Sequence, residues 1–244
     1  EEITDNGFAV ARVSYQDIAP DQNDGFQNGP GSLFPGNAYD SWGKLGVWAW
    51  GLSRIMDYLV QEETLDAGRV AVVGHSRLGK AALLCGAMDV RFSLVIACES
   101  GAGGAALFRG KEGENVADLC RNFPYWFCGN FKKWQNREEE LPFDQHFTAA
   151  LAAPRHLYLA GAVDDEWADP LSEFLTGQAV TPVYEMLGQQ GLAADRLPSA
   201  GDVFHEAVSV STSVPAPIIW EGMTGSCLWS TGKSKGYRID IPDI

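Results

Sequence analysis

Residues 69–88 read RVAVVGHSRLGKAALLCGAM, and this stretch decides the fold. Its first part, from Arg69 to Gly74, is apolar and β-branched, which is typical of a short buried strand. From Leu78 to Met88, small and apolar residues recur at the spacing of a helix. The chain therefore passes from a strand into a helix through a very short turn, and Ser76 stands at the bend.

The same alternation continues on both sides of this unit. Apolar residues recur at helical spacing from 41 to 61, and further buried strands are predicted at 7–13, 92–98 and 156–161. Strands separated by helices imply a mostly parallel sheet. At 244 residues the chain can bury one large core, so we expect a single α/β domain over residues 1–244.

Two segments do not follow this pattern. The stretch from about 108 to 147 is rich in aromatic residues and too long for a plain connection, which predicts an insertion near the site. After Gly191 the periodicity weakens, and residues 191–244 form a tail that we cannot assign to helices or strands.

Composition excludes some classes of function. The net charge of −14 would repel nucleic acid, because affinity for phosphate backbones depends on clustered Lys and Arg. The same charge opposes an acidic sugar at long range, so a site for a uronate must supply its own local cations. We therefore expect no nucleic-acid partner.

Cysteine usage and hydropathy narrow the setting of the protein. The five cysteines show neither a C-x-x-C pair nor the spacing of a zinc site, so no metal is expected. No apolar run approaches the roughly 20 residues that span a bilayer. The first residues lack the basic start of a signal peptide, so we expect either a cytoplasmic protein or one whose leader lies outside this chain.

Ser76 is placed where α/β-hydrolases hold a nucleophile on a strained elbow between strand and helix. Backbone N–H groups at the start of the helix would face an oxyanion there. The usual G-x-S-x-G pattern is only half met, because Leu78 stands where the second glycine is expected and the glycine follows as Gly79. The alternative to a nucleophilic role is that Ser76 is only the N-cap of the helix.

A nucleophilic serine needs an acid and a histidine, which follow it in that chain order in this fold. Glu99 ends the strand at 92–98, and Asp164, Asp165 and Asp169 follow the strand at 156–161. Each of them, taken alone, could equally be a solvated loop carboxylate.

The segment 74–80, GHSRLGK, resembles the G-x-S-R-x-G-K signature of the glucuronoyl esterases, carbohydrate esterase family 15. The likeness covers about residues 5–190, and its further blocks are YQDI at 15–18, WAWGLSR at 48–54, ESGAGG at 99–104, NFPYWF at 122–127 and LPFDQH at 141–146. The resemblance implies an α/β-hydrolase fold with a three-layer sandwich, here without the first strands of the family fold.

The resemblance also implies roles for individual residues. Ser76 would attack an ester of 4-O-methyl-glucuronic acid, and Arg77 would assist the oxyanion with its guanidinium and backbone N–H. Lys80 would reach the sugar hydroxyls, which makes Arg77 and Lys80 the local cations of the site. Glu114 and Trp167 match positions that hold the sugar, although ordinary packing could also explain either residue.

The acid and the base are less determined. Family members carry the acid at the position of Glu99 or of Asp165, and this chain has both. The Gly-Gly-His type of motif that supplies the histidine in relatives is absent, and of the four histidines only His205 follows the acids. Chain order therefore makes His205 the candidate base, while His75 is expected to point away from the nucleophile.

The expected function is a serine esterase that cleaves 4-O-methyl-glucuronoyl esters between lignin alcohols and glucuronoxylan, without a cofactor. An acetyl-xylan or other carbohydrate esterase, or a non-catalytic carbohydrate-binding relative without a working histidine, are the alternatives. We expect a monomer that does not bind membranes, and the resemblance implies a secreted or periplasmic location.

Overall fold

The computed structural model describes residues 2–34, 39–110, 112–200, 203–204, 206–213 and 225–232. Its centre is a seven-stranded sheet with the order β1-β7-β2-β3-β4-β6-β5. The strands are β1 (Phe8–Ser14), β2 (Leu65–His75), β3 (Leu94–Cys98), β4 (His156–Ala162), β5 (Val203–Phe204), β6 (Val208–Ser213) and β7 (Gly225–Gly232). The α-helices are α1 (Glu2–Asp5), α2 (Tyr15–Ile18), α3 (Lys44–Leu59), α4 (Arg77–Met88), α5 (Val116–Asn122), α6 (Gln145–Ala150) and α7 (Pro170–Met186).

The middle of the sheet is parallel and its two sides are antiparallel. β2, β3, β4 and β6 pair in parallel, whereas β7 runs antiparallel to both β1 and β2, and β5 runs antiparallel to β6. The predicted parallel strands form the centre of the sheet, and the antiparallel strands make the whole sheet mixed. The antiparallel strands β5 and β7 come from the tail at residues 191–244. They were not predicted, because short strands of small polar residues show little hydrophobic periodicity.

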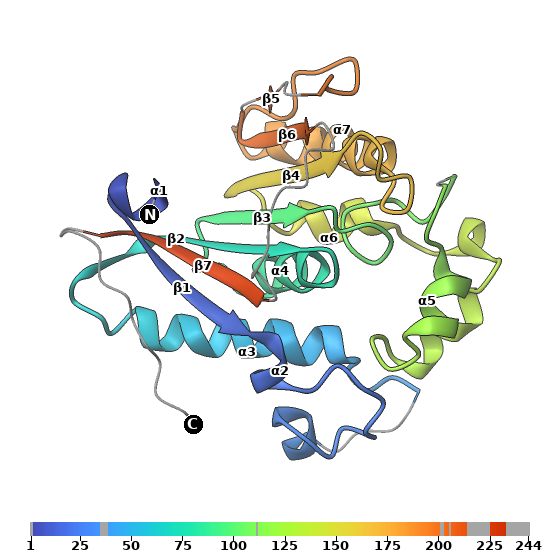
Figure 1. The fold of residues 1–244 in the computed structure, drawn as a ribbon. Helices are drawn as coiled ribbons and strands as arrows, with labels where there is room; N and C mark the ends of the chain where they lie inside the picture. The colour runs from blue at the N-terminus through green and yellow to red at the C-terminus, as the bar shows by residue number, and fades with distance from the viewer. Residues whose placement is uncertain are drawn as a thin grey trace.

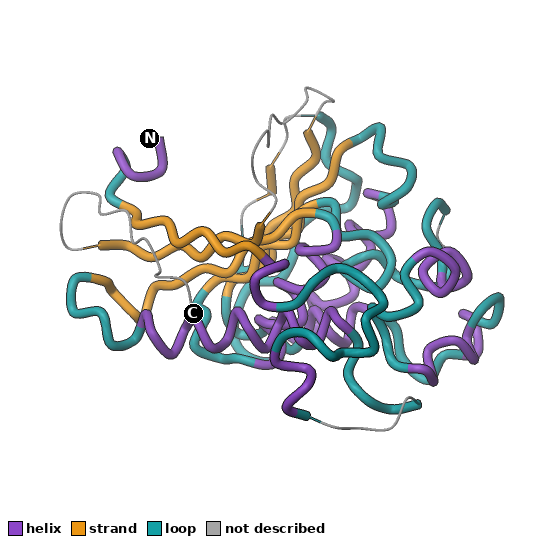
Figure 2. Tube along the Cα trace, turned by 60° about the horizontal axis from the view of Figure 1, so that its bottom comes forward, coloured by secondary structure: helices purple, strands orange, loops and turns teal. Residues whose placement is uncertain are grey.

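The long helices form one layer on one face of the sheet. The strands β2, β3, β4 and β6 follow one another in a single direction, and right-handed crossovers in a single direction place every connecting helix on the same face. Accordingly α4 packs against α3 and α6, and α6 packs against α7 (Figures 1 and 2). In the described part of the chain, the long helices α3, α4, α6 and α7 therefore form a connected layer beside the sheet.

Two cores hold these layers together. The main core lies between the sheet and the helices, and its fully buried members include Met56, Val72, Phe92 and Leu157. A second core, around Trp48, joins α3 and α4 to the segment 108–141. The aromatic insertion is therefore a packed extension of the fold, and Figure 1 shows α5 beyond the carboxyl ends of β2, β3 and β4.

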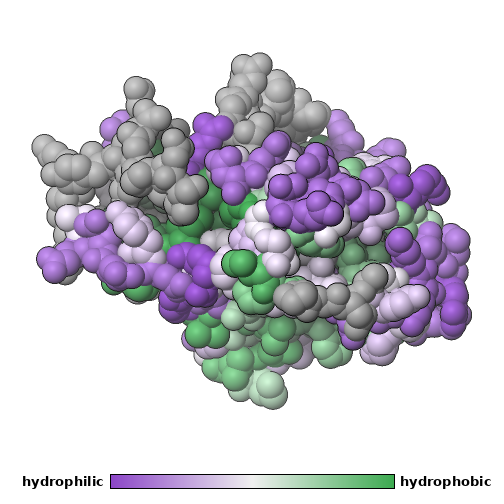
Figure 3. Space-filling model, turned by 90° about the horizontal axis from the view of Figure 1, so that it is seen from below, coloured by the Kyte–Doolittle hydropathy of each residue, from purple (hydrophilic) through white to green (hydrophobic). Residues whose placement is uncertain are grey.

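The surface is divided by hydropathy. On the face seen from below, hydrophobic residues gather toward the lower edge of the view, whereas its right side is hydrophilic (Figure 3). None of the described helices has both the length and the apolar character needed to cross a membrane.

Candidate active site

Ser76 occupies a strained bend between β2 and α4. Its backbone has φ 55° and ψ −126°, and non-glycine residues rarely adopt a positive φ. The Ser76 N–H donates to the carbonyl of Cys98 at 2.9 Å, which ties the bend to the end of β3. Its hydroxyl makes no capping bond to α4, so the helix-cap interpretation of this serine is not supported.

Two glycines let the strand and the helix approach closely at this bend. A Cβ on Gly74 would collide with the backbone carbonyl of Leu78, and a Cβ on Gly79 would come within 2.9 Å of the Cys98 carbonyl oxygen. Gly79 therefore permits the close contact between strand and helix for which the G-x-S-x-G motif has a glycine at position 78. This explains how Leu78 is tolerated at that position.

Arg77 lies in a socket built by three segments of the chain. Its Nη1 donates to Oδ2 of Asp21, a carboxylate whose other oxygen accepts from Trp126 Nε1 at 2.8 Å and from the Tyr125 hydroxyl at 3.1 Å. The guanidinium carbon lies 5.2 Å from the ring centroid of Trp126 and 5.6 Å from that of Phe123. An ion pair and two ring faces thus fix the direction of this cation.

The same carboxylate affects its neighbours electrostatically. Burial, followed by the negative charge of Asp21, raises the pKa of Tyr125 to about 12, so its hydroxyl stays protonated and remains a donor. The Phe123 and Trp126 rings stack at 3.8 Å with an interplanar angle of 7°. The insertion therefore supplies the walls of the arginine socket.

Lys80 is buried beneath the bend, one helical turn after Ser76. Its Nζ donates to the carbonyls of Ser100 at 2.8 Å and Ala102 at 2.7 Å, and to Oε2 of Glu114 at 2.7 Å. An ammonium group has three donors, so these contacts use all of them. Burial lowers the pKa of Lys80, and the adjacent Glu114 carboxylate opposes that shift.

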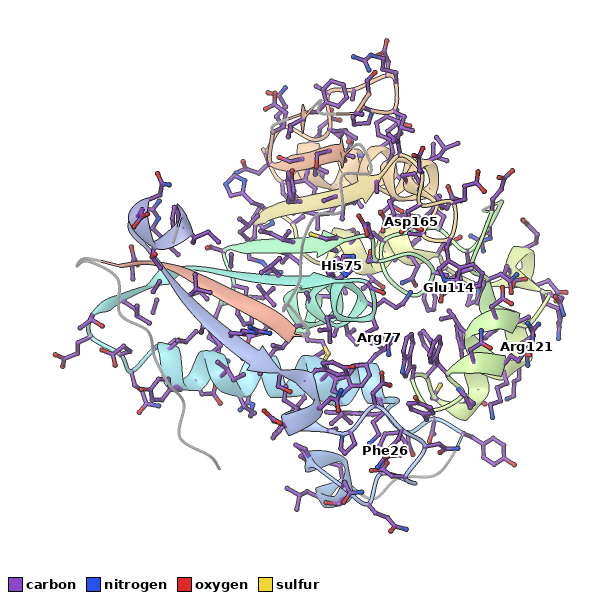
Figure 4. All side chains as sticks on the ribbon, in the orientation of Figure 1. Phe26, His75, Arg77, Glu114, Arg121 and Asp165 are labelled. Carbon is purple, nitrogen blue, oxygen red and sulfur yellow. The ribbon has the colours of Figure 1, made fainter. Side chains whose placement is uncertain are left out.

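Glu99 stands at the end of β3 beside the elbow, in a left-handed conformation with φ 44°. Its Oε2 lies 2.8 Å from Nε2 of His75, the last residue of β2. The histidine that was expected to point away from the elbow is thus the hydrogen-bond partner of one predicted acid. In Figure 4, His75, Arg77, Glu114 and Asp165 surround the carboxyl ends of the central strands.

Asp165 and Trp167 lie on the loop between β4 and α7. Oδ1 of Asp165 accepts from the backbone N–H of Ala168 at 3.0 Å, which closes a local turn. The carbonyl of Trp167 accepts from the N–H of Glu114 at 3.0 Å. Trp167 itself is 51% exposed. The loop therefore joins the second predicted acid to the Lys80–Glu114 pair and leaves about half of Trp167 exposed.

His205 lies outside the described residues, but its neighbours are placed. Phe204 belongs to β5, which is four strand positions from β2, or about 19 Å at the usual spacing of roughly 4.8 Å. Ala207 bonds to Leu157 at the amino end of β4, whereas the bend lies at the carboxyl end. These described neighbours lie far from Ser76, because β5 is an edge strand that folds back along β6.

Two further residues of the site could not be found from the sequence. Asp21 stands in an irregular segment without periodicity, and Glu173 lies on α7, seventy-three positions from Ser100, which it contacts. Neither lies in a block that carried the resemblance. The local sequence signals only the start of the helix that carries Glu173. Oδ1 of Asp169 accepts from the Ser172 N–H and caps α7, and Pro170 takes the first helical position.

The family model described as glucuronyl esterase, fungi, matches residues 2–188, which include every described residue of the site. This chain belongs to the glucuronoyl esterase family. Among curated relatives, carbohydrate esterase MZ0003 from an unknown prokaryotic organism is 42% identical over 222 residues, covering 85% of this chain and 49% of the relative. The 4-O-methyl-glucuronoyl methylesterase of Podospora anserina is 37% identical over 194 residues, covering 75% and 40%.

Solved glucuronoyl esterases confirm the α/β-hydrolase prediction. The enzyme from Solibacter usitatus superposes with a TM-score of 0.77 at 44% identity, covering 82% of this chain and 52% of that one. The enzyme from Teredinibacter turnerae gives 0.78 at 34% identity, covering 86% and 53%. A mutant glucuronoyl esterase from Sporotrichum thermophile, solved with methyl 4-O-methyl-β-D-glucopyranuronate, gives 0.62 at 31% identity, covering 71% and 50%. The chain spans about half the length of these relatives.

Proposed function

We propose that the chain carries the nucleophile and the sugar-binding side of a serine esterase for 4-O-methyl-glucuronoyl esters. The observation that carries the proposal is the strained Ser76 at the strand-to-helix bend, followed directly by Arg77, whose guanidinium is held by Asp21. Its relatives named 4-O-methyl-glucuronoyl methylesterases support the choice of ester.

In the proposed reaction, the Ser76 hydroxyl loses its proton to an imidazole and attacks the ester carbonyl. The oxyanion of the tetrahedral intermediate is stabilised by Arg77 and by backbone N–H groups at the start of α4. The intermediate collapses to an acyl-enzyme, and the alcohol leaves with the proton from the imidazole. Water then repeats the sequence, which releases the glucuronic acid and regenerates Ser76.

Glu99 and Asp165 are the two candidates for the acid that orients the imidazole. Glu99 already holds an imidazole, that of His75, at 2.8 Å, whereas the Asp165 oxygen Oδ1 serves its own loop. We propose Glu99 as the working acid on this ground. Two histidines are candidates for the base. We propose His205 because it follows the acids in the chain, and His75 because it is hydrogen-bonded to Glu99.

We propose that the sugar lies against Trp167 and the Lys80–Glu114 pair. An exposed indole offers a flat apolar face to a pyranose ring, while the buried pair offers charge beneath it. Since Lys80 uses all three donors inside the protein, a sugar hydroxyl must either replace one of these acceptors or bind the pair through Glu114. The relatives named 4-O-methyl-glucuronoyl methylesterases favour a uronoyl ester over an acetyl ester.

The proposed location is extracellular or periplasmic, where the protein would reach its proposed substrates, glucuronoxylan and lignin-carbohydrate esters. The proposed protein acts as a monomer on this polymer, and the reaction as drawn uses no cofactor.

The test is hydrolysis of methyl 4-O-methyl-glucuronate by the protein and by Ser76→Ala. The proposal predicts that the substitution reduces the rate to background, and equal rates in the two proteins would end it. His75→Ala and His205→Ala assign the base, because loss of the base costs several thousandfold or more. Acetylated xylan as a second substrate separates the uronate esterase from an acetyl esterase.

A second candidate function is non-catalytic carbohydrate binding. It is favoured by the position of the residues around His205, which lie at the far edge of the sheet from Ser76. This candidate predicts that calorimetry detects binding of glucuronate without turnover of any ester. Measurable hydrolysis that depends on Ser76 would exclude it.

A further inference from the structure

A buried carboxylate on α7 lies under the loop that follows β3. Glu173 is 2% exposed, and its Oε1 accepts three hydrogen bonds: from the Ser100 N–H at 2.7 Å, the Ser100 hydroxyl at 2.8 Å and the Gly101 N–H at 2.9 Å. The Ser100 hydroxyl in turn accepts from the Ala105 N–H at 2.8 Å. One side chain of a distant helix thus fixes the backbone of this loop.

The loop that Glu173 holds carries two parts of the proposed site. Glu99, the proposed acid, directly precedes the two residues whose N–H groups are bound. The carbonyls of Ser100 and Ala102 accept two of the three hydrogen bonds from Lys80. A displacement of this loop would therefore move Glu99, the proposed acid, together with the carbonyls that bind the Lys80 ammonium.

A neutral acceptor could make the same three contacts at a lower cost, because burying a carboxylate opposes folding. Burial raises the pKa of Glu173 to about 7, while the bonds from Ser100 and Gly101 and the positive charge of Lys80 lower it. Its second oxygen, Oε2, has no hydrogen-bond partner among the described residues. All three hydrogen bonds that Oε1 accepts come from the loop after β3, so this buried side chain is matched to that loop rather than to the apolar core.

We propose that Glu173 is a positioning residue that holds the loop 99–102, and through it the Glu99 carboxylate and the Lys80 ammonium, in their places at the site. The proposal rests on the proposed esterase function. It adds that a helix outside the site's own motifs sets the geometry of the acid and of the sugar-binding cation at once.

The test compares three variants of the full chain. Glu173→Met removes the acceptor at nearly unchanged volume, and Glu173→Gln restores a neutral acceptor oxygen. Thr176→Val is the matched control, because Thr176 lies one turn later on α7, is fully buried, and donates to the Ala105 carbonyl at 2.5 Å rather than to a residue of the loop 99–102.

The proposal predicts that Glu173→Met lowers kcat for methyl 4-O-methyl-glucuronate about a hundredfold, as small misplacements of reacting groups do. Glu173→Gln should lose about tenfold, because its bonds to the loop are uncharged and weaker. Thr176→Val should keep kcat within about twofold of wild type even where its melting temperature falls. Equal kcat in wild type and Glu173→Met, or parallel losses in Glu173→Met and Thr176→Val, would overturn the proposal.

Amide hydrogen exchange gives a readout that does not depend on activity. In Glu173→Met the amides of Ser100 and Gly101 should exchange faster than in wild type, and Thr176→Val should leave them protected. Unchanged protection in Glu173→Met refutes the positioning role. A wild-type protein without esterase activity refutes the proposed function, and the exchange rates then decide the positioning role on their own.

Discussion

Replacement of Glu114 by leucine is the most informative perturbation of stability in this protein. The change leaves the Lys80 ammonium buried with two carbonyl partners and without its paired carboxylate, which now lies at 2.7 Å. Both side chains are almost fully buried, with 4% and 6% exposure, so solvent reaches the cation over only a small area and replaces the lost partner poorly.

The expected cost is about 3–5 kcal/mol of unfolding free energy, the range found when one partner of a buried ion pair is removed. The measurement is equilibrium unfolding in urea with an unchanged slope, so that the midpoint reports stability. A second substitution, Lys80→Met, removes the stranded charge, and the double variant should recover most of the loss. This recovery distinguishes the stranded charge from a simple packing defect.

The penalty should also depend on pH. Burial lowers the pKa of Lys80, and the Glu114 carboxylate is the largest influence that raises it, so the leucine variant should hold a lysine with a still lower pKa. A group with a depressed pKa loses stability as the pH falls, so the difference from wild type should shrink as the pH rises toward 10. A leucine variant within about 1 kcal/mol of wild type at neutral pH, or a penalty that grows with pH, refutes the reasoning.

Four further predictions follow from the same contacts. Gly74→Ala should cost about 3 kcal/mol in urea unfolding, because its Cβ has no room beside the next helix; a stability equal to wild type would show that the bend can open. Asp21→Asn should lower kcat about tenfold with little change in KM, because Arg77 loses its ion pair; a changed KM with unchanged kcat would place Arg77 in ground-state binding. Glu173→Gln should gain about 3 kcal/mol relative to wild type between pH 4.5 and 7, since burial raises the pKa of Glu173 to about 7 and a carboxyl with a raised pKa loses stability as the pH rises; a difference that is flat with pH would contradict this. Cys98 should resist iodoacetamide at pH 8 in the folded protein and react in urea, because burial raises the pKa of its thiol to about 12; rapid alkylation of the folded protein would show that the end of β3 is open.

The central elements were predictable because their periodicity is strong. The helix expected at 41–61 is α3, Lys44–Leu59, and the strand expected at 156–161 is β4, His156–Ala162. The edge strand β5 and the inner strand β7 were missed because each is defined by its partners in the sheet. A strand such as Val203–Phe204 exists only through its pairing with β6, which no local pattern reveals.

The site shows the same division between local and distant information. Ser76 was predicted from a local turn, and the roles of Arg77 and Lys80 were implied by the resemblance of residues 74–80 to the family signature. Asp21 and Glu173 were missed because their roles depend on contacts across 56 and 73 positions, and no spacing rule connects residues so far apart. The bond between His75 and Glu99 was missed for the same reason, since it joins the ends of two strands that only the parallel register brings together.

Labelling with a fluorophosphonate, read by mass spectrometry of the digested protein, tests the central claim most directly. An activated serine at the bend predicts one adduct on the peptide that contains Ser76, and none after the protein is unfolded or after Ser76→Ala. A folded protein in which Ser76 stays unmodified while the reagent is in large excess would contradict the assignment of Ser76 as the nucleophile.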